Sequence, residues 1–328
     1  MALKIVITGG AGFLGASLAR QILKRGTAAG PDGRQTEIRE LMLVDLVPAA
    51  IDDPRVRSIV VQTLDQSTVA AVLGRDTDSV FHLAAVVSAA AEADFDLGMH
   101  VNVDGIRAVL EGSRALPRPP RLVFTSSIAA FGGKLPAVVT DGVAATPTNS
   151  YGAQKAIGEL MVADYARKGF VDGRSVRLPT IVVRPGRPNK AASSFASGII
   201  REPLNGEAAI CPISRDTKVW ILSPRRAVEA LMRVHDIDAA TWGPRSALNL
   251  SGLTVTVGEM AAALERVAGA KVAARIAWQP DASLQTIVGG WPGEFATERA
   301  TQLGFTGDAD MDAIIRAYVE DHLPGGPR

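Results

Sequence analysis

Two groups of residues in this sequence have the types and spacing needed for chemistry on a small molecule. In the first, Tyr151 and Lys155 lie four residues apart in a helix-like stretch and therefore share one helix face. A phenol with an ordinary pKa of about 10 is a poor base near neutral pH, but a neighbouring ammonium favours the phenolate, and a shift of ~3 pH units corresponds to about 4 kcal/mol. Ser126 and Ser127 end an apolar run. A serine hydroxyl there could hold the reacting oxygen while Tyr151 exchanges its proton.

The second group is a glycine cluster between an apolar run, residues 4–7, and a helix-like stretch. Its glycines are Gly9, Gly12 and Gly15. Glycines at this spacing permit a tight strand-to-helix turn, a close approach of backbone N–H groups to a pyrophosphate, and close packing of the helix on the strand. The alternative is that these glycines serve packing alone. The strand before and the helix after favour a dinucleotide phosphate site.

An acidic residue supports the dinucleotide site. Asp45 closes the apolar run 41–44, about thirty residues after Gly15 instead of the usual ~20. Residues 27–40 are polar and turn-rich, so we expect them to form a long surface connection that accounts for the extra length. A carboxylate at this strand end accepts hydrogen bonds from ribose hydroxyls and repels a 2′-phosphate, which favours NAD over NADP. A solvated aspartate in a turn is the alternative.

The elements that must position these groups alternate along the chain. Apolar runs predict strands at 4–8, 41–45, 57–61, 79–84, 121–126 and 176–183, and helical periodicity falls near 14–25, 66–73, 98–116 and 150–168. This order predicts an α/β fold with a doubly wound parallel sheet of the Rossmann type. Further helices are expected near 225–236, 256–268 and 309–322. We expect residues 1–185 to form the dinucleotide-binding core with the catalytic residues, and 186–328 to form mainly a smaller substrate-binding lobe, with segments returning to the core.

Composition limits the classes of partner. The chain has 328 residues, 47% hydrophobic content and a formal net charge of +1, so it can bury a large core and shows no electrostatic case for nucleic acid or an anionic membrane. The single cysteine, Cys211, excludes an internal disulfide and a cysteine metal cluster. We predict no metal. A reducing compartment and the absence of a secretory pattern or membrane span predict a cytoplasmic protein.

At this point the chain resembles the extended short-chain dehydrogenase/reductase family over nearly its whole length. Beyond the glycine cluster and the tyrosine–lysine pair, the resemblance rests on Phe81-His82-Leu83-Ala84-Ala85, Asn102-Val103-Asp104-Gly105 and Arg184-Pro185-Gly186. It implies an NAD(P) site and a catalytic set of Ser127, Tyr151 and Lys155. Lys155 would also form hydrogen bonds with the ribose hydroxyls of the cofactor. Ser126 would lie beside the nicotinamide ribose. The expected cofactor-binding residues are Gly9, Gly12, Phe13, Leu14, Gly15, Asp45, Leu64, Leu83, Ala84, Asn102, Ser126, Tyr151, Lys155 and Pro179.

The adenine contact and His82 fit this family pattern less directly. The family's acidic adenine contact has no clear counterpart, because Asp65 is out of phase with the motif, and only Leu64 is carried over. His82 could act as a general base, but it follows an interior strand, so a hydrogen-bonded core histidine is the favoured interpretation. Members of the family often pair through the helices near 98–116 and 150–168, which implies a homodimer.

The segment 177–226 departs from the nucleotide-sugar members of the family and resembles bacterial aldonate 2-dehydrogenases. Arg184, Arg187 and Lys190 place cations there, and an arginine suits a carboxylate, although a solvated basic loop is the alternative. The expected substrate-binding residues are Ser127, Tyr151, Arg184, Asn189 and Lys190. The resemblance implies NAD-dependent oxidation of the 2-hydroxyl of a short aldonic acid. D-erythronate is the favoured substrate, with 2-oxo-tetronate as its product. A nucleotide-sugar epimerase or dehydratase with tightly bound NAD and a non-catalytic dinucleotide sensor are the alternatives.

Overall fold

The structure, a computed structural model, describes residues 2–186, 192–244 and 247–327 and divides the chain into two compact units. The first unit consists of Met1–Ala130, Asn149–Arg177 and Val228–Leu248. The second unit consists of Phe131–Thr148, Leu178–Ala227 and Asn249–Arg328. The chain therefore passes repeatedly from one unit to the other. The expected assignment of cofactor binding to residues 1–185 and of substrate binding mainly to the rest stays a prediction.

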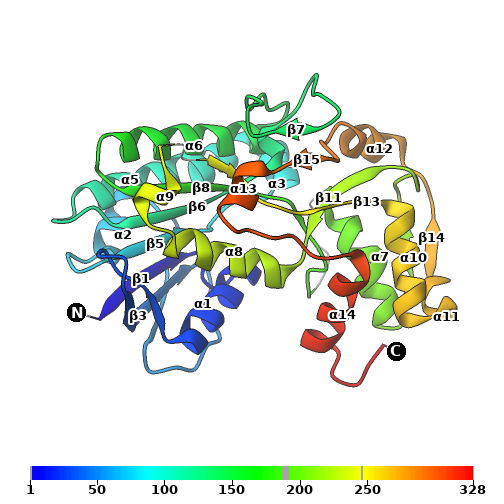
Figure 1. Cartoon of the computed structure of the whole chain (residues 1–328), viewed down its shortest axis with the longest axis horizontal. Coiled ribbons are helices and arrows are strands. Elements are labelled where there is room, and N and C mark those ends of the chain that lie inside the picture. Colours follow the sequence, from blue (N-terminus) through cyan, green and yellow to red (C-terminus); the bar gives the residue numbers. More distant parts are fainter. Residues whose placement is uncertain (1, 187–191, 245–246, 328) are drawn as a thin grey trace. The chain divides into compact units, whose positions relative to one another are not determined.

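The first unit is built on a large, mostly parallel sheet (Figure 1). Within the described residues this sheet has eight strands, seven of them in the order β12-β8-β6-β5-β1-β3-β2, and β4 pairs with β3. The pairs β3–β4, β1–β3, β1–β5 and β5–β6 are all parallel. The strands are β1 (Leu3–Thr8), β2 (Thr27–Ala29), β3 (Gln35–Asp45), β4 (Val56–Val60), β5 (Ser79–His82), β6 (Arg121–Ser127), β8 (Asp172–Leu178) and β12 (Ala247–Asn249). The chain runs outward from β1 in both directions, so the predicted doubly wound fold is confirmed.

Helices cover both faces of this sheet (Figure 1). On one face lie α2 (Gln66–Val72), α5 (Gly105–Arg114) and α6 (Ser150–Arg167), and on the other lie α1 (Phe13–Arg25) and the first-unit part of α8 (Pro224–Asp236). Apolar side chains from the strands, among them Val6, Val80 and Leu122, share one core cluster with Val69 of α2 and Ile106 of α5. Short elements complete the unit: α3 (Ser88–Ala93), α4 (Phe95–Gly98), η1 (Met99–Asp104), η2 (Ile128–Ala130) and α9 (Ala239–Trp242).

Three elements differ from the sequence-based expectations. Residues 27–40 are not a loop, because β2 pairs antiparallel with the first half of β3 and forms a hairpin. The expected helix at 98–116 is interrupted by the π-helical segment η1. The expected strand at 176–183 begins earlier, at Asp172, and Pro179 separates it from β9 (Thr180–Ile181). Proline lacks the N–H that a continuous strand needs for its ladder.

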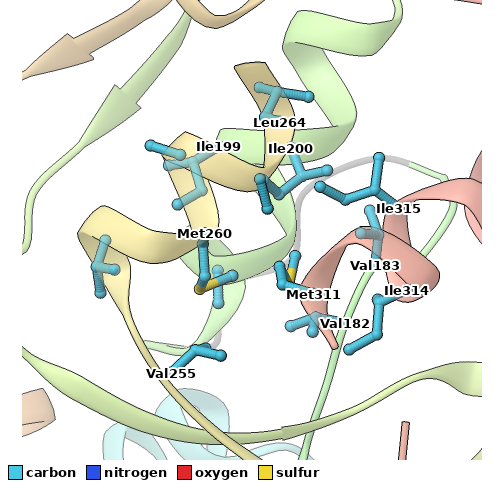
Figure 2. Packing of buried hydrophobic residues seen from close by; sticks show 14 of the residues in the cluster. Val182, Val183, Ile199, Ile200, Val255, Met260, Leu264, Met311, Ile314 and Ile315 are labelled. Atoms are coloured by element: carbon cyan, nitrogen blue, oxygen red, sulfur yellow. The ribbon is translucent and has the colours of Figure 1, made fainter. Parts of the chain in front are cut away.

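The second unit has its own core (Figure 2). A three-stranded sheet of β13 (Leu253–Thr256), β11 (Lys218–Leu222) and β9 lies beside α7 (Ser194–Leu204), α10 (Val257–Ala268) and α14 (Met311–His322). Figure 2 shows Ile199, Met260 and Ile315 packed together from the three helices. The smaller elements are β7 (Val139–Thr140), β10 (Ala209–Cys211), α11 (Ala270–Ala273), β14 (Ile276–Trp278), α12 (Ala282–Gly289), β15 (Phe295–Ala296) and α13 (Glu298–Gln302).

Within the part of the chain that the structure describes, no helix is both long enough and apolar enough to cross a bilayer. Cys211 is buried and forms no disulfide.

Candidate active site

The glycine turn lies where the strand order reverses, between the carboxyl ends of β1 and β5. Gly9 has φ of +72°, a conformation that residues with a side chain rarely adopt. A Cβ atom on Gly9 would lie 2.8 Å from the backbone nitrogen of Ala84, and one on Gly15 would lie 2.1 Å from the carbonyl oxygen of Gly9. Only glycine fits either position. The turn is thus packed directly against the segment after β5 that contains Leu83 and Ala84.

The amino end of α1 follows this turn. Gly12 is the N-cap and offers no side-chain hydrogen bond to the helix, and Phe13 and Leu14 are its first two residues. The backbone N–H groups at this position have no acceptor within the helix, and the helix dipole favours a negative charge beside them. These residues therefore fit a pyrophosphate.

Asp45 lies at the end of β3 and contacts the same turn. Its Oδ2 accepts hydrogen bonds from the backbone N–H groups of Ala11 at 2.9 Å and Gly12 at 3.1 Å. Its Oδ1 accepts from the N–H of Leu46 at 2.7 Å. The carboxylate is consequently held at the glycine turn, in the place where it could accept further bonds from a ribose.

The next candidate, Leu64, lies between β4 and α2. Leu64 is partly buried and packs against the apolar core of the first unit. The neighbouring Asp65 is the N-cap of α2, where it accepts a 2.8 Å hydrogen bond from the N–H of Thr68, and this bond lowers the pKa of the carboxyl. Asp65 thus caps a helix, and its exclusion from the adenine site stays a prediction.

Asn102 is buried in the π-helical segment η1 and holds the chain that follows Ala84. Its side-chain oxygen accepts from the N–H of Val86 at 2.8 Å, and its amide donates to the carbonyl of Val86 at 3.1 Å. The same amide donates to Gln154 Oε1 on α6 at 2.7 Å. Asn102 therefore links the segment after β5 to the helix that carries Tyr151 and Lys155.

The tyrosine and lysine lie in the first turns of α6. Asn149 caps this helix by accepting a 2.8 Å hydrogen bond from the N–H of Gly152. Tyr151 is half-buried, whereas Lys155 is 3% exposed and donates from Nζ to the carbonyl of Thr125 at 2.8 Å. The ammonium lies 4.9 Å from the Phe124 ring centroid and 5.6 Å from that of Tyr151. The predicted juxtaposition of Tyr151 and Lys155 is therefore present.

A small residue lets α6 approach the sheet this closely. A Cβ atom on Gly158 would lie 2.6 Å from Cζ of the Phe124 ring. The close approach keeps Lys155 within reach of the β6 backbone. Burial lowers the pKa of Lys155 to about 8, even though the negative charge of Glu159 acts in the opposite direction.

The two serines at the end of β6 have different surroundings. Ser127 is half-buried, and its Oγ accepts a 3.1 Å hydrogen bond from the N–H of Ala129. Ser126 is 2% exposed, and its hydroxyl donates to Glu159 on α6. The Ser126 side chain is therefore directed toward the helix. Ser127 and Lys155 share this strand end, because Lys155 binds the carbonyl two residues before Ser127.

His82 is buried behind the site. Its Nδ1 lies 2.7 Å from the hydroxyl of Thr8, and its ring stacks on Phe124 with centroids 5.9 Å apart. Burial, assisted by the positive charge of Lys155, lowers the pKa of His82 to about 3. These surroundings are those of a neutral core histidine, as the sequence favoured.

The remaining candidates belong to the second unit or fall outside the described residues. Pro179 is buried between β8 and β9. The backbone N–H of Arg184 donates to Ser197 Oγ at 3.1 Å, and its carbonyl accepts from Arg201 at 2.8 Å. Arg187, Asn189 and Lys190 lie outside the described residues.

Sequence reasoning missed one buried ion pair beside the site. Glu159 is 5% exposed and binds the Arg177 guanidinium with both oxygens, at 2.8 and 2.6 Å. The available signal was the spacing, because Glu159 follows Lys155 by four residues on the same helix face.

Comparison with known proteins identifies the family. Residues 5–238 match the model of the NAD dependent epimerase/dehydratase family. This chain belongs to that family. Its cofactor is NAD, in agreement with the glycine turn and with Asp45.

Relatives extend the match to the whole chain. The chain is 54% identical over 320 residues to a D-erythronate dehydrogenase of Cupriavidus necator, covering 97% of this chain and 98% of that protein. It is 41% identical to a D-erythronate dehydrogenase of Haemophilus influenzae, covering 97% and 99%. A solved structure described as the nucleoside-diphosphate-sugar epimerase from Agrobacterium tumefaciens superposes with a TM-score of 0.91 at 40% identity, covering 99% of this chain and 95% of the other.

Proposed function

We propose that this protein is an NAD-dependent dehydrogenase that oxidises the 2-hydroxyl of a short aldonic acid, with D-erythronate as its substrate and 2-oxo-tetronate as its product. The observation that carries the proposal is the placement of Tyr151, Lys155 and Ser127 around the end of β6, in a chain 54% identical to a D-erythronate dehydrogenase. The choice of substrate rests on this relative, and the three side chains are suited to proton transfer.

In the proposed reaction Tyr151 removes the proton from the 2-hydroxyl as general base. Lys155 favours the phenolate through its positive charge and donates to the ribose hydroxyls, while Ser127 orients the substrate hydroxyl. Bound NAD supplies the acceptor for the hydride that leaves C2 of the substrate. Two electrons pass with the hydride, and one proton passes to Tyr151, so the alcohol becomes a ketone.

The cofactor-binding roles form part of the proposal. Gly9, Gly12 and Gly15 would shape the turn, and the N–H groups of Phe13 and Leu14 would bind the pyrophosphate. Asp45 would bind the adenosine ribose, Leu64 would lie near the adenine, and Leu83 and Ala84 would line the site. Asn102, Ser126, Tyr151, Lys155 and Pro179 complete the proposed set.

The carboxylate of the substrate needs a cationic partner. Arg184, Asn189 and Lys190 are the proposed ligands, because an arginine can bind a carboxylate with two parallel hydrogen bonds. Loss of the true ligand should cost about 2–4 kcal/mol in kcat/KM, since the anion would then be buried and poorly paired. Single alanine variants at these positions would identify it.

A second candidate function is a nucleotide-sugar epimerase or dehydratase that retains NAD. The observation in its favour is the 40% identity to the solved structure described as an epimerase. Such an enzyme would keep NAD through purification and form no net NADH. A dinucleotide sensor, the third possibility, would need no proton-transfer set, and Tyr151 beside Lys155 disfavours it.

The deciding experiment is a screen of C3 to C6 aldonates and UDP-sugars with NAD, followed at the NADH absorbance. D-erythronate should be oxidised, UDP-glucose should not, and the methyl ester of the acid should lose most of the activity. Turnover confined to UDP-sugars, or equal rates on the acid and its ester, would overturn the assignment.

We also propose a homodimer, formed through the helices near residues 98–116 and 150–168, which are η1, α5 and α6. Ile157 and Leu160 on α6, and Phe95 and Leu97 on α4 directly before η1, are exposed, with exposed fractions between 38% and 72%. Light scattering should give twice the chain mass, and Leu160→Glu should give the monomer. The proposal includes a cytoplasmic location and no binding of nucleic acid or membranes.

A further inference from the structure

A buried set of charged groups continues beyond the tyrosine and lysine along the inner face of α6. Tyr151, Lys155 and Glu159 follow one another at intervals of four residues, so all three project from one face of the helix. Lys155 and Glu159 are 3% and 5% exposed. Water therefore screens their charges poorly, and each charge must be balanced by the protein.

Glu159 is fixed from two strands. The guanidinium of Arg177, at the end of β8, binds both of its oxygens, and the hydroxyl of Ser126, at the end of β6, donates to one of them. A bidentate arginine–carboxylate pair fixes the position of the carboxylate and places a positive charge beside it. Glu159 is thus held as a fixed anion one helical turn beyond Lys155.

The other titratable groups facing Lys155 do not provide a negative charge in the resting protein. Within the described residues these are Tyr151 on its own helix and His82 on β5, and Thr125 on β6 contributes a neutral carbonyl. His82 stays neutral because burial lowers its pKa to about 3. Glu159 is the opposite charge that acts on Lys155, and it counteracts the effect of burial.

We propose that Glu159 is a positioning residue for the reaction, whose fixed carboxylate keeps Lys155 an ammonium ion beside Tyr151 while Arg177 balances the charge of that carboxylate. With Tyr151 as phenol, the four groups carry one net positive charge, and with Tyr151 as phenolate they sum to zero. The buried set is therefore neutral in the state that the reaction needs. This role rests on the proposed function for its catalytic consequence, but not for its effect on Lys155.

The test measures the protonation of Lys155 directly. Protein labelled with 13C at the lysine Cε is titrated by NMR, and Lys155→Met assigns the signal. In the wild type the midpoint should fall at about 8. Glu159→Gln should lower it by ~1 pH unit, because an opposite charge within reach of a buried ammonium shifts its pKa by about 1–3 units. Glu159→Asp should retain most of the wild-type midpoint.

Asp164→Asn is the matched control, because it removes one carboxylate from the same helix at an exposed site and should leave the midpoint unchanged. If Glu159→Gln does not fold, Arg177→Gln is the second variant, because it leaves the Glu159 carboxylate without its balancing cation and should raise the midpoint. The remaining lysine signals report folding. A Lys155 midpoint equal to that of the wild type in either folded variant would overturn the inference.

The pH dependence of kcat/KM with NAD and D-erythronate gives the catalytic readout. Because Lys155 acts as an ammonium, the limb on which activity falls with rising pH should move to lower pH in Glu159→Gln by the same amount as the NMR midpoint. A limb that stays in place would contradict the positioning role. If the wild type does not oxidise D-erythronate, the proposed function fails, and the NMR titration still decides the inference.

Discussion

The two ends of strands β5, β6 and β8 both bury charged and polar groups, yet they differ in what these groups contact. At the amino ends, Arg121 and Arg174 share the carboxylate of Asp172, at 2.9 and 2.7 Å. Both arginines also donate to carbonyls at the end of α8, including that of His235. His235 in turn lies 2.8 Å from the hydroxyl of Ser79. The charges there are paired within the protein.

At the carboxyl ends the buried charges also have partners within the protein, but the side chains next to them are partly exposed. Glu159 binds Arg177 and Lys155 binds a backbone carbonyl, but Tyr151 and Ser127 remain half-buried at the edge of this set. The comparison separates two uses of buried charge on the same strands. At one end the charges join a helix end to the sheet, and at the other, as we propose, they set the protonation state of the groups that would face the substrate. Variants at the amino ends should therefore mainly lower stability, and variants at the carboxyl ends should mainly lower catalytic activity.

The largest effect is expected at the carboxyl ends. Tyr151→Phe should lower kcat by ~10²–10⁴-fold, because the ring remains but the exchangeable proton is lost. NAD binding, measured by calorimetry, and the free energy of unfolding should stay close to the wild type. Tyr165→Phe, on the same helix, is the control and should keep most of the activity. If Tyr151→Phe retained most of the wild-type kcat, Tyr151 would not be the base.

At the amino ends the expected loss is one of stability. Arg174→Met should lower the free energy of unfolding by about 3 kcal/mol, because it leaves buried carbonyls at the end of α8 and Asp172 with fewer partners. Urea unfolding measures this change, and kcat/KM of the folded fraction should stay close to the wild type. Arg167→Met, at an exposed ion pair, should change stability by less than ~0.5 kcal/mol. Loss of activity without loss of stability would contradict the comparison.

Acid should lower the free energy of unfolding through Asp236, which lies at the end of α8 in this same region. Burial raises the pKa of Asp236, but hydrogen bonds from His235 and from the N–H of Ala29 outweigh burial and lower the pKa to about 2, below its ordinary 3.8. The carboxylate thus contributes stability above pH 3.8, at most about 2 kcal/mol, and this contribution is lost as the pH falls toward 2. Asp236→Asn should reduce stability near neutral pH and flatten its fall between pH 4 and 2. An unchanged acid limb in urea titrations would refute this assignment.

The smallest effect concerns cofactor choice. Asp45→Ala should reduce the preference for NAD over NADP by about tenfold, because it removes an acceptor for the ribose hydroxyls and the repulsion of a 2′-phosphate. Ratios of kcat/KM with the two cofactors measure the preference. An identical ratio in the variant would show that Asp45 does not contact the ribose.

Much of the fold could be predicted because its signals are local. The apolar runs and the glycine turn predicted the doubly wound sheet, and the spacing of Tyr151 and Lys155 placed them on one helix face. The hairpin of β2 and β3 was missed, because polar residues on an edge strand resemble a loop. The π-helical segment around Asn102 was missed as well, because helical periodicity in the sequence does not distinguish it from an α-helix.

The buried ion pairs were the least predictable part of the site. Glu159 and Arg177 resemble ordinary surface charges in the sequence, whereas in the structure Glu159 is buried on α6, which lies close to β6 at Gly158. Arg174 shows the same difficulty, since the carbonyls that it binds at the end of α8 lie about sixty residues along the chain. Such contacts depend on which elements meet, and this information is not local.

The hydrogen bonds of Asp45 have a consequence for redesigning the cofactor preference. One carboxylate oxygen accepts the N–H groups of both Ala11 and Gly12. A basic residue at position 45 would therefore remove the side-chain acceptor of both N–H groups and leave Gly12 only its 3.2 Å bond to the Gly9 carbonyl, as well as changing the charge beside the expected ribose. An enzyme converted to NADP by this substitution alone would bind both dinucleotides less tightly. A successful conversion needs a second residue that accepts those two N–H groups, so the position must be exchanged together with the turn that it supports.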